Sequence, residues 1–377
     1  MLYVSKKNDA ALTKKSKKSK FEKILISPNF FKLVVMIDSK TKKILVIRLS
    51  SLGDILLTYP LIRILKEKEN NPEIHFIVKE KFVQAIESNP YIDKIFLLNE
   101  TNQKEIRNQI KNAKYDIVID LQNNFRSQNL YPFNLKSRIY RFKKPTLKKF
   151  LLVKFKINLL KDNPSIAIHY IKTIYPDYKP ENLPLYFEIP EEKEKQSLEK
   201  LPEHFKNKVI IGICPGSKHF TKRYPVDLFE VLLKKLIERN YFVALFGGTE
   251  DKEICKSLEI DDYAIKNFQN ENDLFETAAL MKKCSVILTN DSGLMHLSSL
   301  LKIPTVAIFG STVKEFGFAP IFEKSIIVEN DKLDCRPCSH IGRSSCPEKH
   351  FKCMRDIPPD LIVQKIEELI SEGKNNG

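Results

Sequence analysis

Four loops of this 377-residue chain gather the residue types that proton transfer and phosphate binding require. The first, residues 48–54, follows an apolar run and contains Gly53, which allows a tight turn, and Asp54 at the expected start of a helix. An aspartate there caps a helix well. A carboxylate at the end of a strand can instead act as a general base. The loop alone leaves both roles open.

The second loop, residues 215–225, offers one glycine, two hydroxyls and three cations between an expected strand and an expected helix. Backbone N–H groups, the hydroxyls of Ser217 and Thr221 and the ammonium of Lys222 would together suit a phosphate. The loop lacks the spacing of a Walker phosphate loop. A solvated basic loop is the alternative.

The third loop, residues 289–296, also joins an expected strand to an expected helix. Ser292 and Gly293 stand at the helix N-terminus, where free N–H groups and a partial positive charge favour a diphosphate. His296 follows one helical turn later. A single histidine is more often structural, but this one accompanies a second phosphate-type loop. A fourth loop, residues 309–312, follows what we expect to be the last strand and forms another wall of the same pocket.

Alternating strands and helices must position these loops. The first series has strands at 44–49, 74–78, 95–98 and 117–121 and helices at 54–65 and 81–88. The second has strands at 209–214, 242–246, 286–288 and 305–309 and helices at 226–239, 273–282 and 294–301. Helices are also expected at 191–200 and 359–371. This alternation is typical of α/β proteins with doubly wound parallel sheets, which bind ligands at the carboxyl ends of their strands. We therefore expect two Rossmann-like domains, at 42–200 and 201–377, with the active site in the cleft between them.

Lysine and arginine outnumber the acidic residues by 63 to 47, and the net charge of +16 favours anionic partners. Residues 1–41 form a basic extension that we expect to be disordered, and Met36 is an alternative start of translation. Residues 136–161 hold ten basic side chains and no acidic one, which is most simply a solvated face. Motifs of RNA- or DNA-binding modules are absent, so nucleic acid is not an expected partner.

The chain is expected to stay in the cytoplasm, because no apolar run approaches the ~18 residues of a membrane span and the start lacks the order of a signal peptide. Four cysteines nevertheless gather within 19 residues, at Cys335, Cys338, Cys346 and Cys353. In a cytosolic chain such a cluster binds metal more often than it forms disulfides, but its spacing is not that of a standard zinc finger. Structural Zn²⁺, redox-labile disulfides and packed thiols all stay open, and none of them makes the cluster catalytic.

In these loops and strands the chain resembles glycosyltransferase family 9, the lipopolysaccharide heptosyltransferases. The matching pieces occur in family order, at 44–54, 116–122 with Arg126 and Ser127, 215–225, 246–248, and 290–293 with His296. The Ser-Leu-Gly-Asp and Asp-Ser-Gly-x-x-His pieces are specific as a pair. The resemblance implies the GT-B fold, in which two Rossmann-like domains flank the active site and a C-terminal helix packs back on the first domain.

The resemblance also implies a role for each matching residue. Asp54 is the implied general base. The implied donor-binding residues are Ser217, Thr221, Lys222, Asp291, Ser292, Gly293 and His296, with Glu250 or Glu253 reaching the donor ribose. The expected acceptor-binding residues are Ser51, Gly53, Arg126, Lys143 and Lys144.

The reaction so implied is an inverting transfer from a nucleotide sugar, most simply ADP-heptose, that requires no cofactor and no metal ion. Asp54 removes a proton from the acceptor hydroxyl, while Lys222 and the N–H groups near Ser292 and Gly293 stabilise the leaving diphosphate. The acceptor would be an anionic lipid-linked saccharide at the cytoplasmic face of the inner membrane. Residues 136–161 would then contact that acceptor or the membrane surface, to which basic clusters are attracted.

Three other functions stay open. The chain could be a family 9 transferase that uses another nucleotide sugar, a GT-B-fold sugar-nucleotide epimerase, or a non-catalytic protein that binds nucleotide or anionic lipid. An epimerase would leave residues 136–161 without a purpose. Asp54 argues against a pure binding protein, because a carboxylate that faces a diphosphate does not help to bind it.

Overall fold

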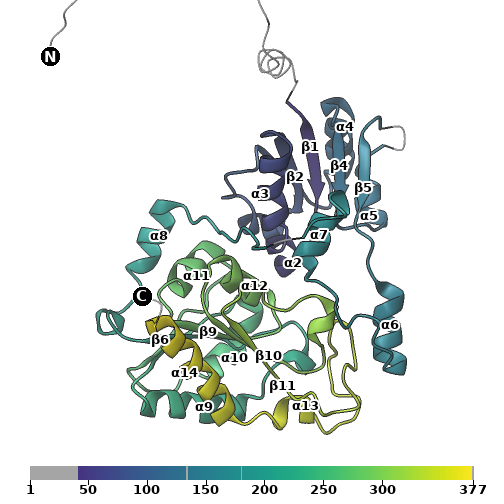
Figure 1. The fold of residues 1–377 in the computed structure, drawn as a ribbon. Helices are drawn as coiled ribbons and strands as arrows, with labels where there is room; N and C mark the ends of the chain where they lie inside the picture. The colour runs from purple at the N-terminus through teal and green to yellow at the C-terminus, as the bar shows by residue number, and fades with distance from the viewer. Residues whose placement is uncertain (1–40, 133–134, 180, 376–377) are drawn as a thin grey trace, which may run out of the picture. The chain divides into compact units, whose positions relative to one another are not determined.

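Five parallel strands form the first sheet, in the order β3-β2-β1-β4-β5 (Figure 1). They are β1 (Lys43–Ile47), β2 (Glu73–Lys79), β3 (Lys94–Leu98), β4 (Ile117–Asp120) and β5 (Arg138–Arg141). From Ile44 onward β1 is buried, and β4 is buried throughout, as expected for apolar runs covered on both faces. The chain runs outward from β1 to β3 and returns to the other side of β1 as β4. The carboxyl ends of β1 and β4 therefore border the crossover point, where such sheets bind ligands.

Six parallel strands form the second sheet, in the order β11-β10-β9-β6-β7-β8. They are β6 (Ile210–Cys214), β7 (Phe242–Leu245), β8 (Ile265–Asn267), β9 (Val286–Asn290), β10 (Thr305–Phe309) and β11 (Ser325–Glu329). The same reversal of direction occurs here between β6 and β9. Both sheets thus have the doubly wound topology that the sequence predicts.

Helices connect the strands in both series. The first series contains α2 (Leu52–Leu56), α3 (Tyr59–Lys68), η1 (Glu80–Ala85), α4 (Gln103–Ala113), α5 (Phe125–Gln128), α6 (Thr146–Phe155) and α7 (Ile166–Ile174). The second contains α8 (Glu191–Leu198), η2 (Glu203–Phe205), η3 (Phe220–Lys222), α9 (Val226–Glu238), η4 (Thr249–Asp251), α10 (Lys252–Ser257), α11 (Leu274–Met281), α12 (Gly293–Leu300), η5 (Lys314–Phe316), α13 (Lys352–Arg355) and α14 (Pro359–Asn375).

The computed structural model describes residues 41–132, 135–179 and 181–375. The basic extension expected at 1–41 therefore lies almost entirely outside the described residues, as does the alternative start at Met36. From Thr41 onward the chain clusters into one unit. A single buried cluster contains both Ile44 of β1 and Ile287 of β9, so the cores of the two series are continuous.

Several expected elements differ from the structure. The helix expected at 54–65 is two helices, because Pro60 lies in the first turn of α3 and cannot donate a backbone hydrogen bond to a preceding turn. The stretch expected as a helix at 81–88 is the 3-10 helix η1. β10 is not the last strand, since the short edge strand β11 follows it. None of the described helices is long and apolar enough to cross a bilayer.

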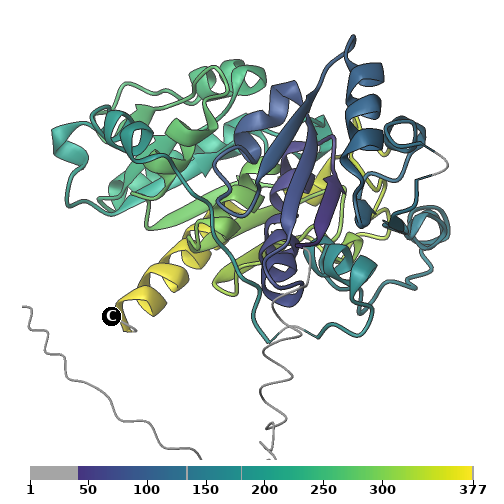
Figure 2. The same cartoon turned by 90° about the horizontal axis from the view of Figure 1, so that it is seen from above.

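The closing helix α14 also differs from the expectation. It packs on α9 and on strands β9, β10 and β11, and Figure 2 shows it running along the second sheet. Its apolar side chains Ile362, Val363, Ile366 and Leu369 belong to the core of that sheet. The implied return of the C-terminal helix to the first domain is therefore wrong. The amphipathic pattern predicts that the helix has a buried face, but not which sheet covers that face.

Candidate active site

Asp54 lies in the first turn of α2, directly after β1, and its two carboxylate oxygens have different partners. Oδ2 accepts hydrogen bonds from the backbone N of Ser51 at 3.3 Å and from its hydroxyl at 2.8 Å. Oδ1 accepts from Nη2 of Arg48 at 2.6 Å and from the hydroxyl of Tyr170 at 3.3 Å. The side chain of Asp54 stays 18% exposed. The capping role left open by the sequence is thus real, and it leaves the carboxylate within reach of a ligand.

The charge of Asp54 is secured by its neighbours. Burial alone would raise the pKa of this carboxyl, but the positive charge of Arg48 and the hydrogen bonds from Ser51 hold the pKa of Asp54 below its ordinary value. Asp54 is therefore ionised at neutral pH and stays so on mild acidification. A proton can move to it once a hydroxyl of a bound substrate develops positive charge.

Arg48 is buried and connects Asp54 with the neighbouring strand β4. Its Nη1 donates to the carbonyl of Leu121 at 2.8 Å, which ties the end of β1 to the end of β4. Its guanidinium carbon lies 5.6 Å from the ring centre of Tyr170 on α7. Arg48 and Tyr170 were not singled out in the sequence as site residues, although Arg48 stands in the loop that carries Asp54.

Glycines bring α2 and α12 into contact. A β-carbon at Gly53 would lie 2.6 Å from Cδ2 of His296, and one at Gly293 would lie 3.0 Å from Cδ2 of Leu52. Gly53 is buried, so the structure gives it a packing role, and its assignment to the acceptor stays a prediction. The contact places the loop of Asp54 directly against the third predicted loop.

We expect Gly53→Ala to destabilise the fold by about 1–3 kcal/mol, because the added methyl must displace the buried His296 ring. Urea unfolding of the purified protein measures the loss. Gly373→Ala on α14 is the matched control, since a β-carbon there meets nothing within 4 Å. Equal stability of the Gly53→Ala variant and the wild type would contradict the packing described here.

The partly exposed Lys222 and the buried Asp291 form an ion pair in which Nζ and Oδ2 are 2.7 Å apart. Lys222 ends η3 in the second loop, and Asp291 directly follows β9. The hydroxyl of Thr312 donates to the same Oδ2 at 2.7 Å, so the fourth loop joins this cluster. Ser292 adopts an extended conformation at the N-cap of α12, and its backbone and that of Gly293 lead into the helix. Three predicted loops of the second sheet thus meet at one place.

The hydroxyls of the second loop are already engaged within the protein. Ser217 is buried and donates to the carbonyl of Asp291 at 3.2 Å. Thr221 is buried, donates to Ser311 at 2.9 Å and accepts from the backbone N of Arg343 at 2.8 Å. Their role in donor binding stays a prediction, and what the structure shows is that both brace the loop.

His296 is buried and neutral. Burial lowers its pKa to about 4, although the charges of Asp291 and Asp54 oppose this. Its Nδ1 is buried and has no hydrogen-bond partner among the described residues. An unpaired buried nitrogen is costly.

Of the three acidic residues that follow the glycine turn, the one that approaches the second loop was not singled out in the sequence. Glu250 and Glu253 are both exposed. Asp251 lies between them in sequence, and a β-carbon at Gly216 would lie 1.9 Å from its Oδ1. Its Oδ2 accepts a hydrogen bond from the backbone N of Gly248 at 3.2 Å. The choice between Glu250 and Glu253 for the donor ribose stays open, and Asp251 is the carboxylate that shapes the glycine turn.

The expected acceptor residues follow three strands of the first sheet: Ser51 and Gly53 come after β1, Arg126 lies in α5 after β4, and Lys143 and Lys144 come after β5. Arg126 and Lys143 are exposed and have no recorded partner in the described chain. Nζ of Lys144 donates to the carbonyl of Gln122 at 2.7 Å, which ties one loop to the other. Ser51 is exposed apart from its bonds to Asp54. Contact of these side chains with an acceptor stays a prediction.

The cysteine-rich segment braces the site. Its four cysteines are free thiols, and no group of three or more metal-ligating side chains is positioned for a metal ion in the described residues. Arg336 donates to the carbonyls of Phe309 and Gly310, and Arg343 pairs with Thr221 through the backbone. Lys156, which follows α6, donates to the carbonyls of residues 335 and 337. The segment thereby joins α6 to the second and fourth loops.

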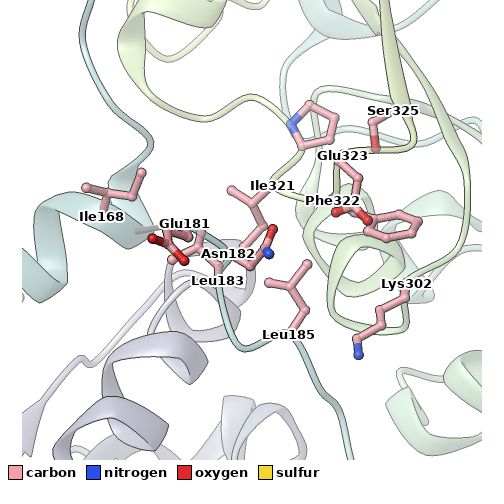
Figure 3. Close-up of a pocket in the computed structure, with 11 residues that line it drawn as sticks. Ile168, Glu181, Asn182, Leu183, Leu185, Lys302, Ile321, Phe322, Glu323 and Ser325 are labelled. Atoms are coloured by element: carbon pink, nitrogen blue, oxygen red, sulfur yellow. The ribbon is translucent and has the colours of Figure 1, made fainter. Parts of the chain in front are cut away.

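A separate pocket lies away from these loops, between α7, the chain that leads to α8, and the segment before β11 (Figure 3). It is lined by Ile168, Glu181, Asn182, Leu183, Leu185, Lys302, Pro320, Ile321, Phe322, Glu323 and Ser325. None of the residues singled out in the sequence is among them. Its two carboxylates and single ammonium also suit a diphosphate poorly, so it is not part of the candidate site.

Comparison with known proteins agrees with this arrangement. Residues 104–349 match the model of glycosyltransferase family 9 (heptosyltransferase). Lipooligosaccharide heptosyltransferase 2 of Haemophilus ducreyi is 27% identical over 358 residues, which cover 87% of this chain and 99% of that protein.

Two solved structures have a similar fold. The structure of E. coli ADP-heptose lps heptosyltransferase II has a TM-score of 0.68 at 21% identity, and covers 88% of this chain and 99% of its own. A glycosyl transferase family 9 protein from Veillonella parvula has a TM-score of 0.70 at 24% identity, with 88% and 98% covered. Together with the two parallel sheets, these similarities confirm the expected GT-B fold.

Proposed function

The chain belongs to glycosyltransferase family 9, the heptosyltransferase family, and from that premise we propose that it transfers heptose from ADP-heptose to the inner core of lipopolysaccharide. Family membership makes the protein a glycosyltransferase, and the names of its relatives suggest the sugar and the acceptor. The observation that carries the proposal is the contact of α2 with α12. It sets the ionised Asp54 beside His296 and the Lys222–Asp291 pair.

We propose a single displacement at the anomeric carbon. The acceptor hydroxyl lies against Asp54, which takes its proton as the new bond between the oxygen and the anomeric carbon forms. The bond from that carbon to the diphosphate breaks on the opposite face, and its electron pair stays on the phosphate oxygen. Inversion follows, because attack and departure occur on opposite faces.

Positive charge must meet the departing diphosphate. Lys222 and the N–H groups at the start of α12 lie on the loops where it would leave, and donors aimed at developing charge are the usual means of lowering such a barrier. This supply of charge by side chains and backbone supports a reaction that is independent of metal ions.

The test is release of ADP by the purified protein from ADP-heptose and a heptose-deficient core acceptor, with a chelator present. We expect release that requires the acceptor and continues in the chelator. UDP- and GDP-sugars serve as competing donors. Faster turnover of one of them would replace ADP-heptose by that donor within the same family.

Two other results of the same assay would indicate one of the alternative functions. Conversion of the donor sugar without any acceptor would indicate an epimerase. Tight donor binding without turnover of any acceptor would indicate a binding protein. Either result would overturn the proposal.

We further propose that α6 and the chain up to Lys161 contact the cytoplasmic face of the inner membrane, where the lipid-linked acceptor would lie. The outer side of this segment combines exposed apolar side chains with lysines. The exposed apolar residues are Leu147, Phe150, Phe155, Ile157 and Leu159, each between 49% and 69% exposed. Its exposed lysines without a partner in the described chain are Lys148, Lys154 and Lys161. Apolar side chains that enter the interface and cations that meet anionic lipid reinforce each other.

We expect the double variant Phe150→Ser/Phe155→Ser to bind vesicles of phosphatidylethanolamine and phosphatidylglycerol about tenfold or more weakly than the wild type. The two rings lie 6.0 Å apart, and each would transfer apolar surface worth about 1 kcal/mol or more. Co-sedimentation measures the binding. Val231→Ser on α9, where the valine is 42% exposed, is the control. Unchanged binding of the double variant would contradict this membrane surface.

A further inference from the structure

Lys149 is a further cation near the candidate site, with no role in the displacement proposed for Asp54 and Lys222. It lies on α6, one helical turn before the inward-facing Leu152 and Val153, which pack with Phe316. Its Nζ is 5.5 Å from the ring centre of Phe316 and 5.1 Å from that of Phe318. Leu147 and Phe150, by contrast, are exposed. Lys149 therefore reaches from α6 across to the loop that follows β10.

Phe318 connects Lys149 with the candidate site. The ring of Phe318 that it faces lies 6.3 Å from the ring of His296, which in turn abuts Gly53. The charges of Asp54 and Lys222 both act on the ammonium of Lys149, as does that of Lys144. Lys149 is thus placed between the loop of the first sheet and the phosphate-type loops of the second.

Among the residues that the structure describes, the ammonium of Lys149 has no hydrogen-bond acceptor or ion-pair partner, and it lies against the rings of Phe316 and Phe318. Three neighbouring cations, in contrast, have acceptors. Arg48 is paired with Asp54 at 2.6 Å and Lys222 with Asp291 at 2.7 Å, so each pair is formally neutral. Lys144 is hydrogen-bonded to a backbone carbonyl. Of these four cations, Lys149 is therefore the one whose charge no neighbouring acceptor balances.

A diphosphate ester is a dianion, and it gains a further negative charge as it leaves. The Lys222–Asp291 pair alone has no net charge with which to balance it. We propose that Lys149 binds the donor diphosphate and supplies the uncompensated positive charge that its departure requires. This inference rests on the proposed nucleotide-sugar donor. It makes α6 part of the active site as well as of the proposed membrane surface.

The test is binding of ADP to the full-length protein, measured by isothermal titration calorimetry. We expect Lys149→Met to weaken ADP binding by about tenfold or more, as for the loss of a charged hydrogen bond. Lys149→Arg should stay near the wild type. The control is Lys104→Met, which removes an exposed lysine on α4. AMP lacks the β-phosphate, so its affinity should differ much less between wild type and Lys149→Met.

The dependence on pH gives a second readout. Burial lowers the pKa of Lys149 to about 8, so the free protein loses this positive charge as the pH rises through that value. The wild type should therefore bind ADP progressively more weakly from about pH 7 to about pH 9, whereas Lys149→Arg, which stays charged, should not. The other titratable groups that face Lys149 are unchanged in the arginine variant, and they are Asp54, Lys144, Lys222, His169 and His340.

Thermal unfolding separates a functional role from a structural one. A methionine fits between the two phenylalanine rings without the cost of burying a charge, so we expect Lys149→Met to be as stable as the wild type or more stable. A lysine retained only for the fold would give the opposite result.

Four outcomes would overturn the inference. The first is equal affinity of wild type and Lys149→Met for ADP, and the second is a pH dependence that persists in Lys149→Arg. The third is an unchanged ADP affinity with a raised KM for the acceptor, which would assign Lys149 to the acceptor. The fourth, a wild type that binds neither ADP nor UDP, would overturn the proposed donor and this inference together. If the wild type binds UDP but not ADP, the donor contains uridine rather than adenosine, and the affinities of wild type and Lys149→Met are compared with UDP instead.

Discussion

Asp54→Asn is expected to lower kcat by about 10²–10⁴-fold, the usual contribution of a general base, while the affinity for ADP stays close to that of the wild type. The amide keeps nearly the shape of the carboxylate but cannot accept the proton of the acceptor hydroxyl. Acceptor-dependent ADP release gives kcat, and calorimetry gives the ADP affinity.

Tyr170→Phe is the matched control for that prediction. It removes the hydroxyl that donates to Oδ1 of Asp54 at 3.3 Å and leaves the carboxylate and its Arg48 partner in place. We expect it to retain kcat within about tenfold. Because Asp54→Asn leaves the buried charge of Arg48 uncompensated, thermal unfolding must show that the variant is folded. A folded Asp54→Asn variant with nearly wild-type kcat would remove the general base from the mechanism.

Lys222→Met should have the second largest effect, a loss of about 10²–10³-fold in kcat, comparable to removal of one donor to a developing oxyanion. Its Nζ is held 2.7 Å from Asp291, so the variant also leaves this carboxylate uncompensated beside the diphosphate. Unlike Asp54→Asn, Lys222→Met should also weaken ADP binding, because the unpaired carboxylate of Asp291 would repel the diphosphate of ADP.

Lys218→Met tests whether that loss is specific. Lys218 lies in the same loop, is exposed and has no recorded partner in the described chain. We expect its kcat and ADP affinity to be unchanged. If Lys218→Met and Lys222→Met gave equal, small losses, the loop would act only through its general positive charge, and the assignment of Lys222 would fail.

The sequence predicts the loops of this site well, because they depend on local features. Apolar runs predict the strands. Asp291 follows the end of β9 directly, and Arg48 follows the end of β1 in the loop that leads to Gly53 and Asp54. Two strand–helix series then bring those ends to two crossover points. Arg48 stands in the first loop and could have been identified as a partner of Asp54 from its charge and proximity in sequence.

Contacts between distant parts of the chain could not be predicted in this way. Tyr170 lies 116 positions from Asp54, and nothing in the pattern of α7 predicts that its hydroxyl reaches the carboxylate. On α6 both faces carry apolar residues, so periodicity does not show that Lys149 points inward. The cysteine-rich segment contacts Lys156 through backbone carbonyls, which leave no signal in the side-chain pattern.

Asp251 shows a similar limit. Three acidic residues follow the glycine turn at positions 250, 251 and 253, and spacing does not distinguish them. Only the close approach of two loops does so, since a β-carbon at Gly216 would overlap the carboxylate of Asp251.

The anomeric configuration of the product tests the central claim most directly, because a single displacement with Asp54 as base allows one stereochemical result. Donor of one defined anomer is converted by the wild type, and the new glycosidic linkage is assigned by NMR from the one-bond coupling at the anomeric carbon. We predict the configuration opposite to that of the donor. Retention of the donor configuration would require an intermediate on the enzyme and would contradict the mechanism.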